Sequence, residues 1–130
     1  MNISFQRKTD LALSVIRTLT ETDGRLSGSE LAREVGTTLA YLPQIVSPLI
    51  AAGWITSGRG PGGGYQLTEA ANGLHLLDVV EVTEGPAESG RCILRDAPCP
   101  GATPCGVHAV WVEARQVLMA GLAKIPVELS

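Results

Sequence analysis

Residues 54–68 read WITSGRGPGGGYQLT, and this stretch indicates the fold most specifically. Residues 54–56 and 65–67 are short runs of strand-forming residues, joined by a Gly-rich loop that carries a single arginine, Arg59. Two such runs separated by a glycine-containing loop predict a β-hairpin. The loop is a weak match to a phosphate-cradling nucleotide loop, because it lacks the Gly-Lys-Ser/Thr ending and leads into a strand.

The segment before the hairpin has the pattern of two short helices. Ser27 and Glu30 have the spacing of a capping box that starts a helix, and Gly36 suits the end of that helix. A second apolar pattern follows residues 37–38 and predicts a helix that carries Leu39 and stops at Gly53. Helix, turn, helix and hairpin follow one another in this order in a winged helix-turn-helix module, although an ordinary helical hairpin has the same first part.

Two prolines lie within the second predicted helix. Pro43 and Pro48 would each remove a hydrogen bond from a helix interior, at a cost of roughly 3 kcal/mol. The sequence leaves three outcomes open: a helix that begins later than Thr38, a kinked helix, or a helix whose strain is offset by packing.

Helical patterns also flank this module. Apolar residues recur at helical spacing from residues 9–10 onward, and residues 74–82 form a short apolar helical pattern. From about residue 107 to residue 124 the apolar positions follow a heptad spacing, which predicts a helix that packs against a second copy, with packing on its own domain as the alternative. The positions of this seam are Val107, Trp111, Ala114, Leu118, Gly121 and Ile125.

The expected fold class is therefore mainly α with a small β-hairpin. We expect a winged helix-turn-helix DNA-binding domain in residues 1–83 and a linker with a cysteine loop in residues 84–106. Residues 107–130 are expected to form a dimerisation helix and a C-terminal tail.

All three cysteines lie in one short stretch, CILRDAPCPGATPCGVH, from Cys92 to His108. The spacing is C-x6-C-x5-C-x2-H, with prolines and glycines between the thiols. Thiolate sulfur suits zinc and iron–sulfur iron, and three Cys with one His would complete a four-ligand set for either. The pattern favours a metal or cluster site over three unrelated cysteines.

Composition limits the other possibilities. The chain has 130 residues, 45% of them hydrophobic, and a net charge of −3, so any DNA binding must come from a few well-placed cations. No apolar run approaches the roughly 20 residues that span a bilayer, and the N-terminal residues lack a signal-peptide core, so we expect a cytoplasmic protein. Ser, His and acidic residues are too scattered to suggest a nucleophile–base pair, so an enzyme is not expected.

Taken together, these stretches resemble the IscR, NsrR and RirA type of iron–sulfur-cluster regulators. The resemblance rests on the hairpin RGPGGGYQLT (residues 59–68), on residues 39–55, on LLDVVEVTEG (residues 76–85), and on the cysteine spacing with its following helix. It implies a bacterial homodimeric winged-helix transcription factor, and it implies that Cys92, Cys99 and Cys105 bind an iron–sulfur cluster.

The resemblance leaves the fourth ligand open. His108 has the place of the histidine in IscR-like proteins, which carry a 2Fe-2S cluster, and this assignment is favoured. Asp10 lies in a segment that resembles NsrR-like proteins, where an aspartate of the partner chain ligates a 4Fe-4S cluster. RirA-like members have only the three cysteines, so a chain with neither extra ligand remains a third possibility.

The resemblance also implies a set of DNA contacts on an inverted-repeat operator. Among the positions that meet base edges in IscR-like proteins, which are Ala40, Pro43 and Gln44 here, only Gln44 keeps a group that can pair with adenine. Other polar side chains could reach phosphates, and Arg59 could enter the minor groove. The expected DNA-contacting residues are Thr38, Tyr41, Gln44, Ser47, Arg59, Gly60, Gly62 and Gly63.

The leading hypothesis is a DNA-binding transcription regulator whose affinity for double-stranded DNA depends on its cluster. A repressor is favoured over an activator. It would sense cluster or iron status, redox state or nitric oxide, with neither a membrane nor a small-molecule substrate as partner. One alternative keeps the fold and replaces the cluster by thiol redox chemistry or zinc. Another is an iron–sulfur electron carrier that binds no DNA, and this one leaves the Gly-rich hairpin unexplained.

Overall fold

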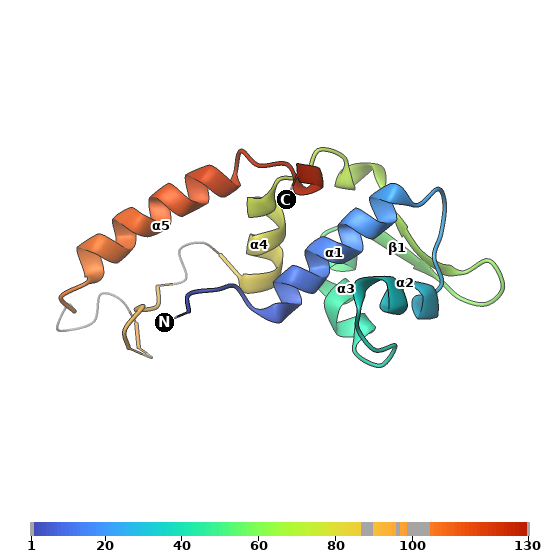
Figure 1. The fold of residues 1–130 in the computed structure, drawn as a ribbon, viewed down its shortest axis with the longest axis horizontal. Helices are drawn as coiled ribbons and strands as arrows, with labels where there is room; N and C mark the ends of the chain where they lie inside the picture. The colour runs from blue at the N-terminus through green and yellow to red at the C-terminus, as the bar shows by residue number, and fades with distance from the viewer. Residues whose placement is uncertain (1, 87–89, 96, 99–104, 130) are drawn as a thin grey trace.

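The winged-helix fold that the sequence predicts is confirmed by a computed structural model, which describes residues 2–86, 90–95, 97–98 and 105–129. Helices α1 to α4 and the hairpin form one body, with the hairpin at one end and α5 along the opposite side (Figure 1). The elements in chain order are α1 (Arg7–Glu21), α2 (Gly28–Val35), α3 (Leu42–Ala51), β1 (Ile55–Gly58), β2 (Gly64–Leu67), η1 (Glu69–Ala71), α4 (Leu76–Glu84), α5 (His108–Leu122) and η2 (Val127–Leu129).

The core is built around α1, which packs against α2, α3 and α4. Its apolar residues recur every three or four positions, so they share one face of the helix, and this face is buried. Each fully buried aliphatic side chain stabilises the fold by about 1.5–3 kcal/mol, so the core depends on this face. The buried core residues include Leu11, Val15, Ile16 and Leu19 of α1, Leu31 of α2, and Leu42, Ile45, Val46 and Leu49 of α3.

Helix α2 has the ends that the sequence predicts. The Glu30 backbone N–H donates to Ser27 Oγ at 3.2 Å, which satisfies one of the free donors of the first turn. The Ser27 hydroxyl in turn donates to the Glu30 carboxylate at 2.9 Å. Gly36 ends the helix with a φ of 77°, a conformation that glycine adopts without strain.

Helix α3 begins at Leu42, so the prediction that this helix already carries Leu39 is wrong. Thr38 holds a turn before the helix, because its side-chain oxygen accepts from the Tyr41 N–H at 3.1 Å and its carbonyl from the Leu42 N–H at 3.0 Å. Leu39 lies in that turn and is 57% exposed. Pro43 falls in the first turn of α3, where no intrahelical N–H donation is required, whereas Pro48 lies inside the helix.

The hairpin is a two-stranded antiparallel sheet in which Ile55 pairs with Leu67 and Gly58 with Gly64. The segment before α2 pairs with it, since Leu26 and Tyr65 exchange two backbone hydrogen bonds of 3.0 and 2.7 Å. The hairpin is therefore attached to the helix-turn-helix and cannot swing independently of α2.

The chain returns to the core after α5, which the sequence did not predict. The Leu76 N–H donates to the Ile125 carbonyl at 2.9 Å, and the Val127 N–H donates to the Leu74 carbonyl at 3.0 Å. Val127 is 3% exposed and belongs to the core of the winged-helix body. The start of α4 and the end of the chain are thus held together.

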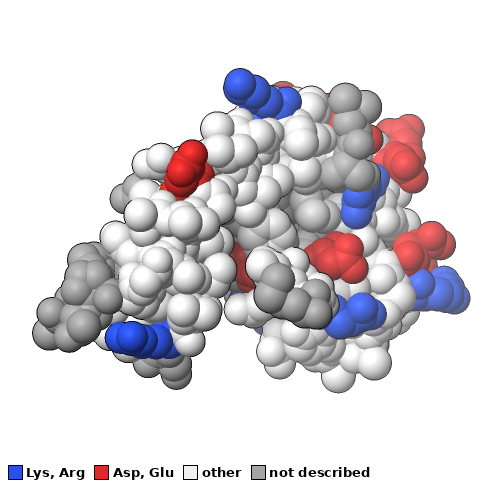
Figure 2. All heavy atoms as spheres, turned by 60° about the vertical axis from the view of Figure 1, so that its left-hand side comes forward, with Lys and Arg blue, Asp and Glu red and all other residues white. Residues whose placement is uncertain are grey.

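Helix α5 contributes no buried residue to the core. Val110 and Val117 are 68% and 70% exposed, and Glu113 and Arg115 are the charged residues within its bounds. On the face of the molecule in Figure 2, charged side chains stand singly or in small groups between stretches of uncharged surface. Within the part of the chain that the structure describes, no helix is long and apolar enough to cross a membrane.

Candidate DNA-binding surface and metal centre

The outer face of α3 carries the polar residues that the sequence proposes for DNA contact. Gln44 and Ser47 are exposed, while Leu42, Ile45, Val46 and Leu49 bury the opposite face of the same helix. Tyr41, immediately before the helix, is 36% exposed, and Thr38 lies in the preceding turn. The structure therefore presents these four side chains on the outside of one helix-turn-helix.

The strands of the hairpin lie beside α3, where Ser57 and Tyr65 line a hollow with Ser47, and the loop between the strands is exposed at Arg59, Gly60 and Gly62. Gly63 needs to be glycine, because a Cβ there would lie 2.8 Å from backbone atoms of Gly58 and Arg59. The Gly63 N–H donates to the Gly60 carbonyl at 2.9 Å and closes a turn at the tip of the loop, and the exposed Arg59 lies just before this turn.

Tyr65 connects the hairpin to both helices of the helix-turn-helix. A Cβ on Gly28, the first residue of α2, would lie 3.7 Å from the Tyr65 ring. On its other side Tyr65 lines a shallow hollow together with Pro43, Ser47 and Ile50 of α3. Hairpin and α3 thus form one continuous surface, a geometry suited to a duplex that is contacted by helix and loop together.

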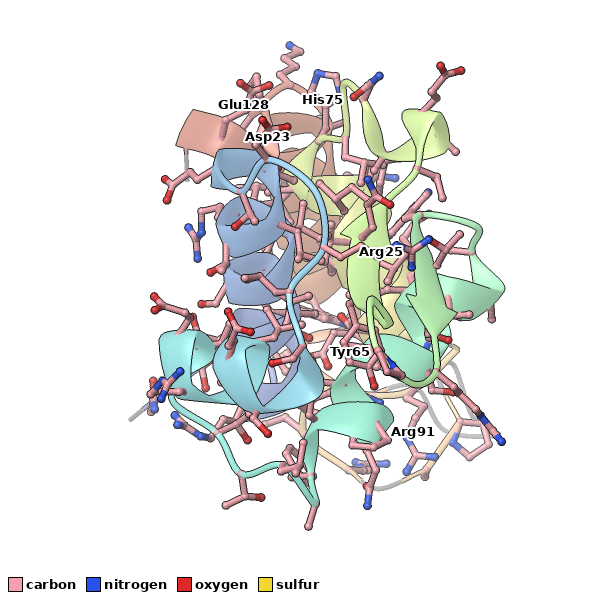
Figure 3. The ribbon with its side chains drawn as sticks, turned by 90° about the vertical axis from the view of Figure 1, so that its right-hand side faces the viewer. Asp23, Arg25, Tyr65, His75, Arg91 and Glu128 are labelled. Atoms are coloured by element: carbon pink, nitrogen blue, oxygen red, sulfur yellow. The ribbon has the colours of Figure 1, made fainter. Side chains whose placement is uncertain are left out.

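One cation beside the hairpin carries no sequence signal. Arg25 lies next to the Leu26–Tyr65 pairing, and Figure 3 shows it between the segment before α2 and the hairpin. Its position depends on a pairing between residues far apart in the chain, so no local motif could have marked it.

Two of the three cysteines meet in the described residues. The sulfur atoms of Cys92 and Cys105 lie 3.3 Å apart, and Cys105 is buried. The Leu94 N–H donates to Cys92 Sγ at 3.4 Å, and the Cys92 N–H donates to the Ala97 carbonyl at 3.0 Å. The backbone around Cys92 therefore forms a small turn that directs an N–H at the sulfur.

The remaining proposed ligands are placed only in part. Cys99 lies outside the described residues. His108 is the first residue of α5 and half-buried, and its N–H donates to the Cys105 carbonyl at 3.2 Å. Among the described residues, to which Cys99 does not belong, no three His, Cys, Asp or Glu side chains come together as a metal site.

Asp10 is exposed in the first turn of α1, where the helix dipole favours a carboxylate. This end of α1 is joined to the end of α4, since the hydroxyl oxygens of Thr9 and Thr83 lie 2.7 Å apart in the core and the Gln6 N–H donates to the Glu84 carboxylate at 2.8 Å. Residues 85–91 connect Glu84 to the cysteine stretch. The end of α1 that carries Asp10 is therefore fixed to the helix from which the cysteine stretch departs.

Known proteins with similar sequences are transcription regulators. IscR of Photobacterium profundum is 35% identical over 89 residues, which cover 68% of this chain and 51% of that protein. IscR of Xenorhabdus nematophila is 29% identical over 106 residues, covering 82% of this chain and 64% of that protein. The chain thus spans about half to two thirds of the length of these relatives.

The solved structure of CymR, described as the global cysteine regulator of B. subtilis, has a similar fold. Its TM-score is 0.72 at 25% identity, over 98% of this chain and 95% of that one. The family model named Rrf2, with the description iron-dependent transcriptional regulator, matches residues 5–128. The resemblance to IscR-type regulators is thereby confirmed, and the chain belongs to the Rrf2 family of iron-dependent transcriptional regulators.

Proposed function

We propose that this chain binds double-stranded DNA as a homodimer and regulates transcription, and that an iron–sulfur cluster held by Cys92, Cys99 and Cys105 controls its DNA affinity. The observation that carries the cluster proposal is the 3.3 Å between the sulfur atoms of Cys92 and Cys105. These two residues flank the connection between the winged-helix body and α5, so a ligand bound there acts on both.

The thiols that the structure brings together fit such a group. Two bonds of about 2.3 Å to one tetrahedral metal ion place their sulfur atoms roughly 3.8 Å apart. The Cys92 and Cys105 sulfurs need to separate only slightly from 3.3 Å to reach that spacing. The N–H of Leu94 already points at one of them, and such N–H···S bonds are among the features that tune iron–sulfur potentials.

The Cys residues and His108 would act by joining two parts of the chain. When bound, the cluster supplies metal–ligand bonds that hold its ligands at fixed separations. Cys92 follows α4 in the chain, whereas Cys105 and His108 stand at the start of α5. Ligation by these residues would fix the start of α5 relative to α4, and loss of ligation would release it.

We assign the fourth ligand to His108 and the cluster to the 2Fe-2S type. The supporting observation is that the His108 N–H donates to the Cys105 carbonyl, so the two residues share one turn at the start of α5. Asp10 of the partner chain, with a 4Fe-4S cluster, is the second assignment. Replacing His108 or Asp10 by alanine and counting iron per chain distinguishes the two.

For DNA binding we propose that the helix, the turn and the loop contact different parts of the duplex. Gln44 on α3 would read a base edge, Thr38, Tyr41 and Ser47 would contact phosphates, and Arg59 with Gly60, Gly62 and Gly63 would approach the minor groove. In this scheme residues 1–83 bind the duplex, residues 84–106 supply the three cysteine ligands of the cluster, and α5 within residues 107–130 holds the two copies together.

The test compares the affinities of two states of the protein, with and without the cluster, for one DNA duplex. Duplexes are selected from a random library with the anaerobically reconstituted protein, and fluorescence anisotropy then gives the affinity of cluster-loaded and cluster-free chains for the selected duplex. We expect an inverted repeat and a difference in affinity of at least about tenfold, which corresponds to a coupling of about 1.4 kcal/mol. Equal affinities of the two states would refute cluster control, and failure to bind any duplex would refute DNA binding.

The same sulfur pair favours a second candidate, a regulator that responds through thiol oxidation. Sulfur atoms 3.3 Å apart can close a Cys92–Cys105 disulfide, in which the two thiols give two electrons and two protons to an oxidant such as a low-molecular-weight disulfide. An iron-free chain whose DNA affinity changes with added oxidant and returns with dithiol reductant would support this candidate. Iron and sulfide content with a visible absorption spectrum separates it from the cluster.

A further inference from the structure

Arg25 is held against the base of the hairpin loop by the pairing of its neighbour. Leu26 exchanges both backbone hydrogen bonds with Tyr65, which places residue 25 beside β2, on the edge opposite to β1, and the Arg25 side chain reaches from there to Gly58 of β1. A Cβ built on Gly58 would lie 3.2 Å from a guanidinium nitrogen of Arg25. The guanidinium therefore lies against Gly58, the residue that precedes Arg59 in the chain.

The positive charge of Arg25 is not neutralised by another side chain within the described part of the protein. Arg25 is exposed and forms no ion pair with a residue that the structure describes. It lines a hollow between the loop and the start of α2 together with Ser27, Glu30 and the loop glycines. The Glu30 carboxylate in this hollow accepts a hydrogen bond from the Ser27 hydroxyl.

A cation at this place matters because the DNA-binding surface is poor in positive charge. Between residues 25 and 67 the basic residues are Arg25, Arg33 and Arg59, in a chain of net charge −3. Neutralisation of phosphates supplies much of the affinity of a protein for DNA, so each cation beside the duplex has a large share of the total.

We propose that Arg25 is a phosphate-contacting residue, which binds the DNA backbone beside the groove that Arg59 enters and so fixes the orientation of the hairpin on the duplex. The inference rests on the proposed DNA binding and adds to it a residue outside the helix-turn-helix and the loop. A guanidinium presents a planar fork of donors that matches two phosphate oxygens, and its contact carries no base preference. Arg25 therefore raises the affinity for DNA and its dependence on salt, and it does not affect which DNA sequence is preferred.

The test measures salt dependence, which a purely structural role does not change. Wild type, Arg25→Ala and Arg25→Lys are titrated with the selected duplex and with a scrambled duplex from about 50 to 200 mM salt. We expect Arg25→Ala to weaken binding to both duplexes by a similar factor of roughly ten, and to reduce the slope of log affinity against log salt by about 0.9. Arg25→Lys should retain most of the slope. Lys124→Ala, which removes an exposed charge next to α5, is the charge-matched control and should leave the slope unchanged.

The outcomes separate this inference from the function on which it rests. If the wild type binds and Arg25→Ala binds with the same affinity and slope, the inference is wrong and the proposed function stands. If Arg25→Ala weakens binding with an unchanged slope and Arg25→Lys behaves like it, Arg25 only supports the hairpin and the phosphate contact is refuted. Absence of wild-type binding overturns both. Far-UV circular dichroism of each variant establishes that it is folded.

Discussion

At the scale of single residues, two glycines of the same hairpin, Gly60 and Gly64, have different physical roles. Gly64 has a φ of +117°, and a Cβ on it would overlap the carbonyl oxygen of Leu26 and lie 2.8 Å from its carbonyl carbon. Gly60 has a φ of +73°, but a Cβ there would meet no atom within 4 Å. Both glycines allow a left-handed backbone, and only Gly64 also allows the close pairing with residue 26.

This difference predicts unequal effects of two alanine substitutions. Gly60→Ala should lower the free energy of unfolding by about 1 kcal/mol, the usual cost of a left-handed conformation for a residue with a Cβ. Gly64→Ala should lower it by more than about 3 kcal/mol, because that cost is joined by steric overlap and the loss of the Leu26–Tyr65 hydrogen bonds. Urea denaturation of both variants measures the difference, and equal losses would show that the pairing of residue 26 contributes nothing to stability.

The sequence predicts which residues are candidates for the cysteine site, but it does not predict how they are arranged. The three thiols indicate a soft metal because thiolate sulfur is a soft ligand. The prolines and glycines between them prevent regular structure, so the thiols lie in a loop. The approach of Cys92 to Cys105 depends on a turn around Cys92 and on the burial of Cys105, and neither follows from residue type. The fourth ligand stays a prediction for the same reason.

At the scale of elements, prediction succeeded where a local hydrogen bond decides the boundary. The limits of α2 follow from Ser27 and Gly36, whose effects act within one helical turn. The start of α3 was misplaced because Thr38 caps a separate turn first, so the helix starts only at Leu42. Of the outcomes left open by Pro43, the later start is the one that the structure shows. Pro48 stays within α3, where it leaves the Gln44 carbonyl without its usual intrahelical donor.

Helix α5 exposes an apolar surface, which we expect a second copy of the chain to cover. Val110 and Val117 are 68% and 70% exposed, one helical heptad apart, so they lie on one side of the helix, next to the seam that the heptad spacing predicts. We expect Val117→Asp to convert a dimer into a monomer in light scattering, because a carboxylate buried in an apolar interface costs several kcal/mol. Its circular dichroism should remain that of the wild type.

Leu39→Asp is the matched control for this substitution. Leu39 is also exposed, at 57%, and it lies in the turn before α3, away from α5 (Figure 1). The control should remain dimeric. A Val117→Asp variant that is still a dimer at micromolar concentration would exclude this face of α5 from the interface, and a monomeric wild type would refute the proposed homodimer.

At the scale of the whole molecule, the residues after α4 form a loop that is closed on the helix at which it starts. The chain leaves α4 at Glu84, passes through the cysteine stretch and α5, and returns to the start of α4 through Ile125 and Val127. In Figure 1 α4 lies between α1 and α5. Sequence patterns could not predict this closure, because a single valine in a short tail has no periodicity that marks it as buried.

This closure predicts that Val127 affects both stability and regulation, although it lies in the tail. Val127 is 3% exposed, so Val127→Ala removes two buried methyl groups and should lower the free energy of unfolding by about 2 kcal/mol. Ile3→Ala, at a site that is 71% exposed and lies outside the proposed dimer interface, should change it by less than about 0.5 kcal/mol. The backbone hydrogen bonds of Ile125 and Val127 hold the chain after α5 to the start of α4, so a loosened tail should also let α5 move without the winged-helix body. The ratio of DNA affinities with and without the cluster should then fall toward one in Val127→Ala. Urea denaturation and the paired anisotropy titrations measure the two effects separately. A destabilised variant that keeps the full wild-type ratio would show that the tail only stabilises the fold, and that coupling passes through the cysteine end of α5 alone.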